Sequence, residues 1–175
     1  YHKELTPEEI LYYIYGILYS NVYREKYSEF LKIDFPRVPF TKDYAIFRKI
    51  SVLGNRLADL HLMKSKELDN PFTKYEGEGD NDKIEKTVYD EQKKRIYINE
   101  SKYFDHVLPE VWAYCIGGYQ VLQKYLKDRK GRLMDDPRHF CRIIAALTKT
   151  QEIQEQLDEI YPEIESDLLT EESPQ

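Results

Sequence analysis

The sequence has little cysteine and glycine and no long apolar run. Its 175 residues include 2 Cys and 7 Gly. Two cysteines, Cys115 and Cys141, are too few for a disulfide framework and lack the paired spacing of a zinc site, so we expect reduced, buried thiols. No segment approaches the roughly 18 apolar residues of a membrane helix, and no signal peptide precedes the first helical pattern. We therefore predict a cytoplasmic protein without a membrane partner.

The sequence also lacks an initiator Met, because it begins at Tyr1. We expect it to be a piece of a longer polypeptide, whose activity would belong to a larger machine. With 41% hydrophobic and 33% charged residues, the chain has the composition of one globular domain.

Acidic residues outnumber basic residues, 32 to 26, but the positive charge is concentrated locally. The formal net charge is −6, which argues against a dedicated nucleic-acid coat and against binding to anionic membranes. The charges are segregated, however: residues 158–172 are acidic with no Lys or Arg, whereas residues 124–132 are strongly basic. Local charge is therefore a better guide to partners than net charge.

The first third of the chain predicts helices. Thr6 at an N-cap, Pro7 at the first helical position and Glu9 at the third form a capping-box signature. We expect that helix to reach about Ser20, and Asn21 to cap a second helix. An extended Pro-containing linker at 34–40 and a third helix over about 42–66, which includes Gly54, should follow. Gly54 either costs about 1 kcal/mol or permits close approach of another element.

The rest of the chain predicts a small sheet and two more helices. A polar loop at 67–85 should precede a hairpin of strands 86–89 and 95–98. A third strand is expected at 111–116, a helix from Tyr119 to about Leu126, and a last helix from Pro137 to about Tyr161. We predict an α+β fold, mostly helical with a small antiparallel sheet of about three strands. The domain should span 1–161, with a helical part at 5–66, the loop at 67–85, sheet and helices at 86–161, and a disordered acidic tail at 162–175.

The pair Gly117-Gly118 raises the question of a phosphate-binding loop. Such loops have a Gly-x-Gly-x-x-Gly or Gly-Lys-Ser/Thr pattern, and neither is present. A tight turn from strand to helix is the simpler reading, with Tyr119, Val121, Leu122, Tyr125 and Leu126 anchoring the helix in the core.

The basic run after this helix favours contact with a nucleic acid. Cations in a last turn complement the helix dipole, and Gly131 suits a helix C-terminus, but this run has more cations than a dipole needs. Together with the hairpin turn, it could form a stripe that neutralises phosphates if both regions face the same way. The residues of this predicted stripe are Lys93, Lys94, Arg95, Lys124, Lys127, Arg129, Lys130 and Arg132.

Catalysis by this chain is not predicted. The histidines His2, His61, His106 and His139 show no paired spacing and no linked carboxylate motif. No Ser-His-Asp, Cys-His or paired-carboxylate constellation can be assembled. We therefore assign no catalytic residue, no metal ligand and no cofactor to this segment. Most of the 16 tyrosines should lie at the edge of the core.

Four blocks, taken in order, resemble a known family. They are TPEEILYYIY at 6–15, YREKYSEFLKIDFPRVPF at 23–40, LADLHL at 57–62 and IGGYQVLQKYLKDRKGR at 116–132. They resemble the C-terminal target-recognition domain of type ISP restriction-modification enzymes and of related adenine-specific DNA methyltransferases. The resemblance extends from Leu5 to about Ile160.

The resemblance implies a module that reads double-stranded DNA within a larger polypeptide. Methyltransferase and possibly helicase domains of the same polypeptide would be its partners, and the methyltransferase would use S-adenosylmethionine. The Asn-Pro-Pro-Tyr motif of such methyltransferases is absent here, so that activity would lie elsewhere. The resemblance does not transfer individual base contacts. Our own hypothesis assigns phosphate contacts to the basic run and base-edge contacts to Arg37, Lys42, Arg95 or Gln120.

A second hypothesis is a helical docking module that packs on a partner domain through its Tyr-rich first helices and makes no direct DNA contact. It predicts self-association of the chain, and unchanged DNA affinity when the basic run is reversed in charge. The two hypotheses are compatible, because a recognition domain must also dock on its methyltransferase.

Overall fold

A computed structural model describes residues 5–169 of the chain, which divide into two compact units. Unit 1 comprises residues 1–65 and 150–175, of which 5–65 and 150–169 are described, and unit 2 comprises residues 66–149. The last helix, α6 (Pro137–Ser166), contributes residues to both units. The predicted helical part at 5–66 corresponds closely to the N-terminal portion of unit 1. The assignment of both units to one domain stays a prediction.

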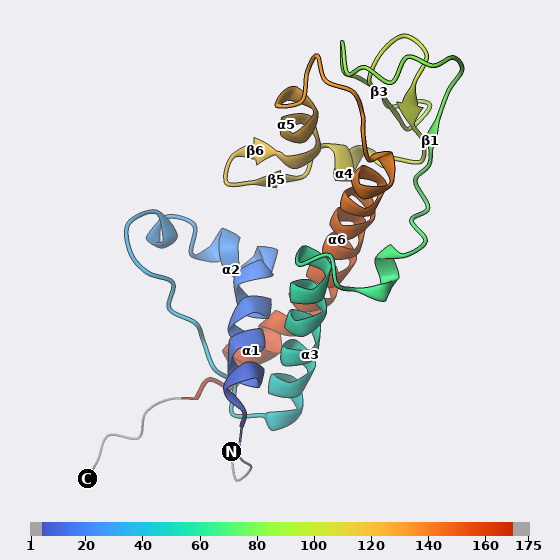
Figure 1. The fold of residues 1–175 in the computed structure, drawn as a ribbon. Helices are drawn as coiled ribbons and strands as arrows, with labels where there is room; N and C mark the ends of the chain where they lie inside the picture. Colours follow the sequence, from blue (N-terminus) through green and yellow to red (C-terminus); the bar gives the residue numbers. More distant parts are fainter. Residues whose placement is uncertain (1–4, 170–175) are drawn as a thin grey trace, which may run out of the picture. The chain divides into compact units, whose positions relative to one another are not determined.

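Unit 1 is helical (Figure 1). Its elements are α1 (Pro7–Tyr19), α2 (Asn21–Lys26), the 3₁₀ helix η1 (Phe30–Lys32), α3 (Tyr44–His61) and the C-terminal part of α6. The predicted capping box at the start of α1 is confirmed: Glu9 N donates to Thr6 Oγ1 at 3.2 Å, and Thr6 N donates to Glu9 Oε2 at 3.0 Å. The hydrogen bond from the Thr6 backbone is the main reason that the pKa of Glu9 is lowered.

Helices α1 and α3 approach each other backbone to backbone. A Cβ atom added at Gly54 of α3 would lie 1.8 Å from the carbonyl oxygen of Tyr12 in α1, so only glycine fits there. Nearby, Ser51 Oγ donates to the Glu9 carbonyl at 2.9 Å. The buried ring of Tyr13 stacks on Phe40 and Phe47, with centroids 4.9 and 4.7 Å away. Of the two expectations for Gly54, close approach of another element is therefore confirmed.

The cap of α2 differs from the prediction by one residue. Ser20, not Asn21, is the N-cap, and its Oγ accepts from Tyr23 N at 3.2 Å. The carboxylate of Asp158 in α6 accepts from Ser20 Oγ at 2.8 Å, from Asn21 Nδ2 at 3.0 Å and from Val22 N at 3.1 Å. Ser20 thus caps the helix while Asp158 satisfies the donors around it, a partner that the local sequence could not reveal.

Replacing Asp158 by alanine is expected to lower the free energy of unfolding by about 2 kcal/mol, because three donors lose a charged acceptor. Glu159→Ala removes the neighbouring, exposed carboxylate and should change stability by less than about 0.5 kcal/mol. Urea denaturation of the two variants, followed by circular dichroism, measures the difference. Equal stabilities would mean that the Asp158 hydrogen bonds contribute nothing net.

The prediction that the chain is disordered after Pro162 is wrong for residues 162–169. Helix α6 continues through Pro162 to Ser166, and Ile164 is fully buried. Beyond the helix, Leu168 forms a β-bridge with Thr41, and Leu169 N donates to the Phe40 carbonyl at 2.6 Å. Burial of apolar side chains and backbone pairing therefore keep this segment ordered, although its acidic composition predicts disorder. Residues 170–175 of the predicted tail lie outside the described residues.

Helix α3 ends at His61, before the predicted Lys66, and Met63 just after it adopts a φ of 57°.

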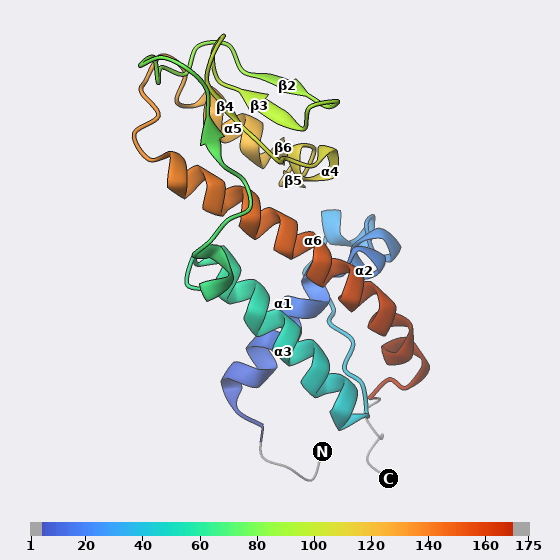
Figure 2. The same cartoon turned by 90° about the vertical axis from the view of Figure 1, so that its right-hand side faces the viewer.

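Unit 2 contains a four-stranded antiparallel sheet, a separate hairpin and short helices (Figure 2). Its elements are the 3₁₀ helix η2 (Lys66–Leu68), β1 (Tyr75–Glu76), β2 (Val88–Asp90), β3 (Arg95–Tyr97), β4 (Tyr103–Phe104), α4 (Pro109–Trp112), β5 (Cys115–Ile116), β6 (Tyr119–Gln120), α5 (Val121–Lys127) and the N-terminal part of α6. The strand order is β1-β4-β3-β2, and β5 pairs with β6. The predicted fold class is confirmed, with four strands in the main sheet where about three were expected.

One core holds unit 2 together. Buried side chains from the sheet, α5 and α6 pack against one another. They are Ile84, Ile96, Ile98, Phe104, Val107, Val111, Leu122, Leu126, Met134, Phe140, Cys141, Ile144 and Leu147. The predicted hairpin is confirmed as β2–β3, in which Val88 pairs with Tyr97 and Asp90 with Arg95. Strand β1 lies within the segment predicted as loop.

The segment from Pro109 to Gln120 folds differently from the prediction. Residues 109–112 form the short helix α4 with Pro at its start, and only Cys115 and Ile116 of the predicted third strand are extended. Gly117 and Gly118 have φ values of 58° and 82° and connect β5 to β6, so they form the turn of a hairpin instead of a strand-to-helix turn. Tyr119, predicted to be in the core, lies in β6 with 63% of its surface exposed.

Candidate nucleic-acid interface

A cluster of positive charge lies in the last turn of α5 and in the turns that follow it. Leu122 and Leu126 of this helix are fully buried, which anchors it and leaves its polar side chains at the surface. Consecutive turns continue the chain to Arg132, where Gly131, with a φ of 85°, donates its amide to the Ile84 carbonyl at 2.7 Å. We call Lys124, Lys127, Arg129, Lys130 and Arg132 the basic end of α5.

Two members of the basic end of α5 are engaged with neighbouring groups. Lys124 Nζ contacts Asp128 Oδ1 at 2.6 Å, and this hydrogen bond is the main reason that the pKa of Asp128 is lowered. The guanidinium of Arg129 lies 3.6 Å from the ring centroid of Tyr125 and donates to the Tyr125 carbonyl at 3.2 Å. Their charge contributes to the local field, but their side chains are held in place.

The other three members are exposed. Among the described residues, no carboxylate lies within 4 Å of the charged groups of Lys127, Lys130 or Arg132. Such cations can exchange their counterions for phosphate groups. The exposed residues Lys127, Lys130 and Arg132 therefore form the strongest candidate contact with an anionic partner.

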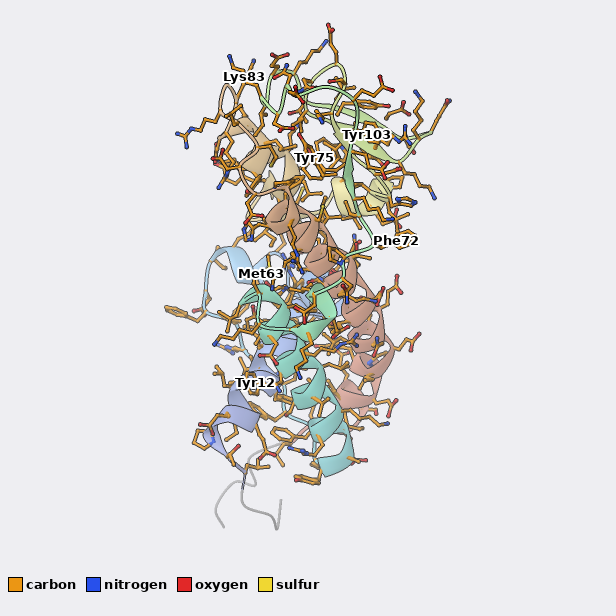
Figure 3. The ribbon with its side chains drawn as sticks, turned by 45° about the vertical axis from the view of Figure 1, so that its right-hand side comes forward. Tyr12, Met63, Phe72, Tyr75, Lys83 and Tyr103 are labelled. Carbon is orange, nitrogen blue, oxygen red and sulfur yellow. The ribbon has the colours of Figure 1, made fainter. Side chains whose placement is uncertain are left out.

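The structure adds one cation that the sequence analysis missed. Lys83, labelled in Figure 3, is exposed and forms a β-bridge with Leu133, while Ile84 N donates to the Arg132 carbonyl at 2.9 Å. This pairing places Lys83 next to the chain that carries Arg132. No local pattern in the sequence signals a pairing between residues fifty positions apart.

The basic turn of the β2–β3 hairpin is a separate group. Lys94 O accepts from Val107 N at 2.9 Å at the turn, whereas Glu85 N donates to Ile98 O at 2.8 Å at the other end of the hairpin, beside Ile84. The turn that carries Lys93 and Lys94 is therefore at the opposite end of the hairpin from Ile84, whose carbonyl accepts the hydrogen bond from Gly131. The structure groups the predicted stripe into two patches.

Arg95 is not grouped with its two neighbours in sequence. Its Nε and Nη2 each lie 3.3 Å from a carboxylate oxygen of Asp105, and its guanidinium lies 4.2 Å from the ring centroid of Tyr103. The hydrogen bond to Asp105 is the main reason that the pKa of Arg95 is raised. Arg95 therefore ties β3 to the segment after β4.

The remaining predicted contacts are Arg37, Lys42 and Gln120, of which only Gln120 lies near the basic end of α5 in the sequence. Arg37 and Lys42 belong to unit 1 and are exposed. The Arg37 guanidinium is 5.3 Å from the ring centroid of Phe30, and Lys42 N donates to the Asp167 carbonyl at 2.9 Å. Gln120 is half-buried in β6, directly before α5.

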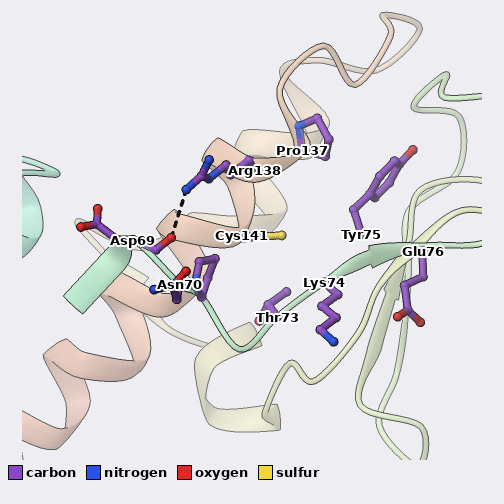
Figure 4. Close-up of a pocket in the computed structure, with 10 residues that line it drawn as sticks. Asp69, Asn70, Thr73, Lys74, Tyr75, Glu76, Pro137, Arg138 and Cys141 are labelled. Carbon is purple, nitrogen blue, oxygen red and sulfur yellow. Dashed lines mark hydrogen bonds between the residues drawn. The ribbon is translucent and has the colours of Figure 1, made fainter. Parts of the chain in front are cut away.

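An open groove of about 570 Å³ occurs in unit 2 (Figure 4). Its lining includes Lys74, Glu76 and Arg138, and Arg138 Nη2 donates to the Asp69 carbonyl at 3.1 Å. Because its lining contains both cations and carboxylates, the groove has no concentrated charge of one sign. It is a weaker candidate for a phosphate backbone than the basic end of α5.

His61 lies in a structural environment. His61 Nδ1 lies 2.8 Å from Tyr15 Oη, and its Nε2 lies 2.9 Å from Thr150 Oγ1. Burial lowers the pKa of His61, which favours the neutral ring. Within residues 5–169, no group of three or more His, Cys, Asp or Glu side chains is arranged to hold a metal ion.

A comparison with known protein families identifies the family of this chain. The model of the Type ISP C-terminal specificity domain matches residues 1–156. The chain belongs to this family. The resemblance inferred from the four sequence blocks is thereby confirmed. No sequence among curated proteins matches the specificity domain, and none of its helices within the described residues is long and apolar enough to cross a membrane.

Solved structures share the fold of this specificity domain. One is a nuclease-deletion mutant of the Type ISP restriction-modification enzyme LlaGI in complex with a DNA substrate mimic, with a TM-score of 0.63 and 21% identity over 89% of this chain. Another is the ATP-dependent Type ISP enzyme LlaBIII bound to DNA, with a TM-score of 0.64 and 22% identity over 90% of the chain. A third is a DrdV–DNA complex, with a TM-score of 0.60 and 22% identity over 95%. The specificity domain covers 14%, 11% and 19% of those chains.

Proposed function

We propose that this specificity domain recognises a short sequence in double-stranded DNA and has no catalytic activity of its own. The family match over residues 1–156 carries this proposal. The three similar structures support it, because each contains DNA or a DNA mimic. The exposed cations at the basic end of α5 provide the charge that a DNA backbone requires.

The remaining activities belong to other parts of a larger polypeptide. This chain covers less than a fifth of each similar structure, which leaves room for methyltransferase and helicase domains. The methyltransferase uses S-adenosylmethionine to methylate adenine at the recognised site. The polypeptide acts in the bacterial cytoplasm, where its DNA substrate is found.

Contacts with DNA divide into two classes. Phosphates are bound by six of the exposed cations of unit 2: Lys83, Lys93, Lys94, Lys127, Lys130 and Arg132. Of these, Lys93 also forms an ion pair with Asp90 at 3.7 Å. Lys124 and Arg129 contribute positive potential near the same surface, since both are engaged with neighbouring groups. Gln120 suits base recognition, because its amide can pair with an adenine edge. Arg37, Lys42 and Arg95 remain proposed contacts, with Arg95 requiring release from Asp105.

Docking on a partner domain is a second function that the structure favours for unit 1. Ile33 and Phe35 are 84% and 87% exposed in the segment between α2 and α3. Two neighbouring apolar side chains in water suit contact with another protein surface. If docking were the only function, the chain would self-associate and would not bind DNA.

Titration of the 175-residue chain with a fluorescent 30-base-pair duplex of randomised sequence at several salt concentrations tests the proposed function. We expect weak binding whose log association constant falls by about 4 to 5 per tenfold rise in salt, because about four to six phosphates are neutralised. Circular dichroism confirms that the chain is folded. Absent or salt-insensitive binding by the folded chain would contradict DNA recognition.

A further inference from the structure

The β5–β6 hairpin is the most exposed pair of strands in the described chain. Ile116 and Tyr119 are 48% and 63% exposed, and Cys115 is also exposed. Ideal Cβ atoms added at Gly117 and Gly118 would have no neighbour within 4 Å. The tip of this hairpin is therefore surrounded by solvent.

Both faces of the hairpin are open. Side chains alternate between the two faces of a strand, and paired residues share a face. Ile116 pairs with Tyr119 on one face, and Cys115 pairs with Gln120 on the other. A hairpin that covered a hydrophobic core would bury one of these faces. In this hairpin, Gln120 is half-buried and the other three strand residues are exposed. The β5–β6 hairpin is a projecting ribbon.

The ribbon is nevertheless rooted firmly. At its base, Val121 N donates to the Tyr114 carbonyl at 3.0 Å, and both side chains pack against the core of unit 2. The turn residues adopt the positive φ values that two-residue hairpins require. The ribbon leads directly into α5, and Figure 1 shows the two elements side by side.

We infer that the β5–β6 hairpin enters the major groove of the DNA and reads base edges, with Tyr119 and Gln120 as the specificity-determining residues. This inference rests on the proposed function. A two-stranded ribbon fits the major groove, which is about 12 Å wide. Ile116 can contact a thymine methyl group, the Gln120 amide can pair with adenine, and Tyr119 Oη can donate or accept a hydrogen bond.

Charge next to the ribbon selects DNA as the occupant. Lys124 Nζ lies 6.0 Å from the ring centroid of Tyr119, and Lys127 follows one turn later on α5. Phosphates that flank a groove would meet these cations when the ribbon lies between them. A purely apolar protein partner would leave Lys127 without a counter-charge, since only Lys124 is paired with Asp128.

The two cysteines provide a probe in the unaltered protein. The expectation of two buried thiols is wrong for Cys115, which is exposed on the ribbon. Cys141 is buried, and burial raises the pKa of its thiol to about 11. Iodoacetamide, which is neutral, should therefore alkylate Cys115 and leave Cys141 as an internal reference. Peptide mass spectrometry measures both rates with and without a duplex pool of randomised sequence at low salt.

We expect DNA at ten times its dissociation constant to slow the alkylation of Cys115 about tenfold. Unchanged alkylation, with binding shown by fluorescence anisotropy in the same sample, would overturn the inference and leave the proposed function intact. Absence of binding in that anisotropy control would instead overturn the proposed function. If the alkylation of Cys115 is slowed in a sample without DNA in which the chain self-associates, the ribbon contacts protein instead of DNA. That result would overturn the inference.

Selection from the same duplex pool tests base reading. Tyr119→Ala and Gln120→Ala should each reduce discrimination at one or two base positions about tenfold or more, as loss of a bidentate base contact does. Phe35→Ala removes an exposed aromatic ring from unit 1 and should leave the selected sequences unchanged. Identical selected sequences for wild type, Tyr119→Ala and Gln120→Ala would overturn base reading by the ribbon.

Discussion

Replacing Lys127, Lys130 and Arg132 together by glutamine is expected to lower DNA affinity about a hundredfold at 0.1 M salt, because three counterions are no longer released on binding. The slope of log association constant against log salt should become shallower by about 3 for the same reason. These three side chains are exposed and have no ion pair within the described chain, so their removal should not alter folding. Fluorescence anisotropy at several salt concentrations measures both quantities.

A control triple variant tests whether the loss of affinity depends on where the three cations lie or only on the change in net charge. Lys32→Gln, Lys49→Gln and Lys64→Gln remove three exposed cations from unit 1 and change the net charge equally. Its affinity should stay within a few-fold of wild type, because none of these three lysines is a proposed DNA contact. Equal losses in the two triple variants would show that the basic end of α5 has no special place at the interface.

Replacing Gly54 by alanine is expected to destabilise unit 1 by about 3 kcal/mol, because the new methyl group would overlap the Tyr12 carbonyl of α1. Helix propensity alone predicts the opposite sign, a gain of about 1 kcal/mol. The sign of the change therefore distinguishes backbone contact from propensity. Chemical denaturation followed by circular dichroism measures it.

The neighbouring position supplies the control for Gly54. Asn55 is exposed on the same helix, so Asn55→Ala should keep or raise stability by a few tenths of a kcal/mol, on the order of the propensity difference. A stable Gly54→Ala variant would mean that α1 and α3 separate without cost. It would contradict the close packing described here.

Local signals in the sequence predicted the local structure well. The capping box of Thr6 and Glu9 needs only four neighbouring residues, and the start of α1 was placed correctly. The β2–β3 hairpin likewise follows from two short runs and a polar turn. The resemblance of four blocks to the type ISP family was confirmed, since it rests on an ordered pattern over most of the chain.

Errors arose where two local signals competed. Val111 and Trp112 have the composition of a strand, but Pro109 is a helix-starting residue, and the helix prevailed. At residues 117–122 the spacing of apolar residues suggested a helix beginning at Tyr119. The paired glycines formed a hairpin turn instead, so the helix starts at Val121.

Nonlocal contacts were beyond the reach of the sequence. The bridge between Lys83 and Leu133 brings a lysine beside Arg132, and the carboxylate of Asp105 removes Arg95 from the group of accessible cations. No sequence pattern next to either pair of residues predicts that they come together. The candidate interface could therefore be predicted as a basic segment, but its division into engaged and accessible cations required the fold.

The openness of the β5–β6 hairpin has a consequence for how recognition can evolve. Its turn is set by Gly117 and Gly118, while Ile116 and Tyr119 project into solvent. Exchanges at such exposed positions change stability by less than about 0.5 kcal/mol. If the hairpin reads base edges as inferred, point mutations there can sample new DNA targets without loss of folding, while the scaffold stays the same.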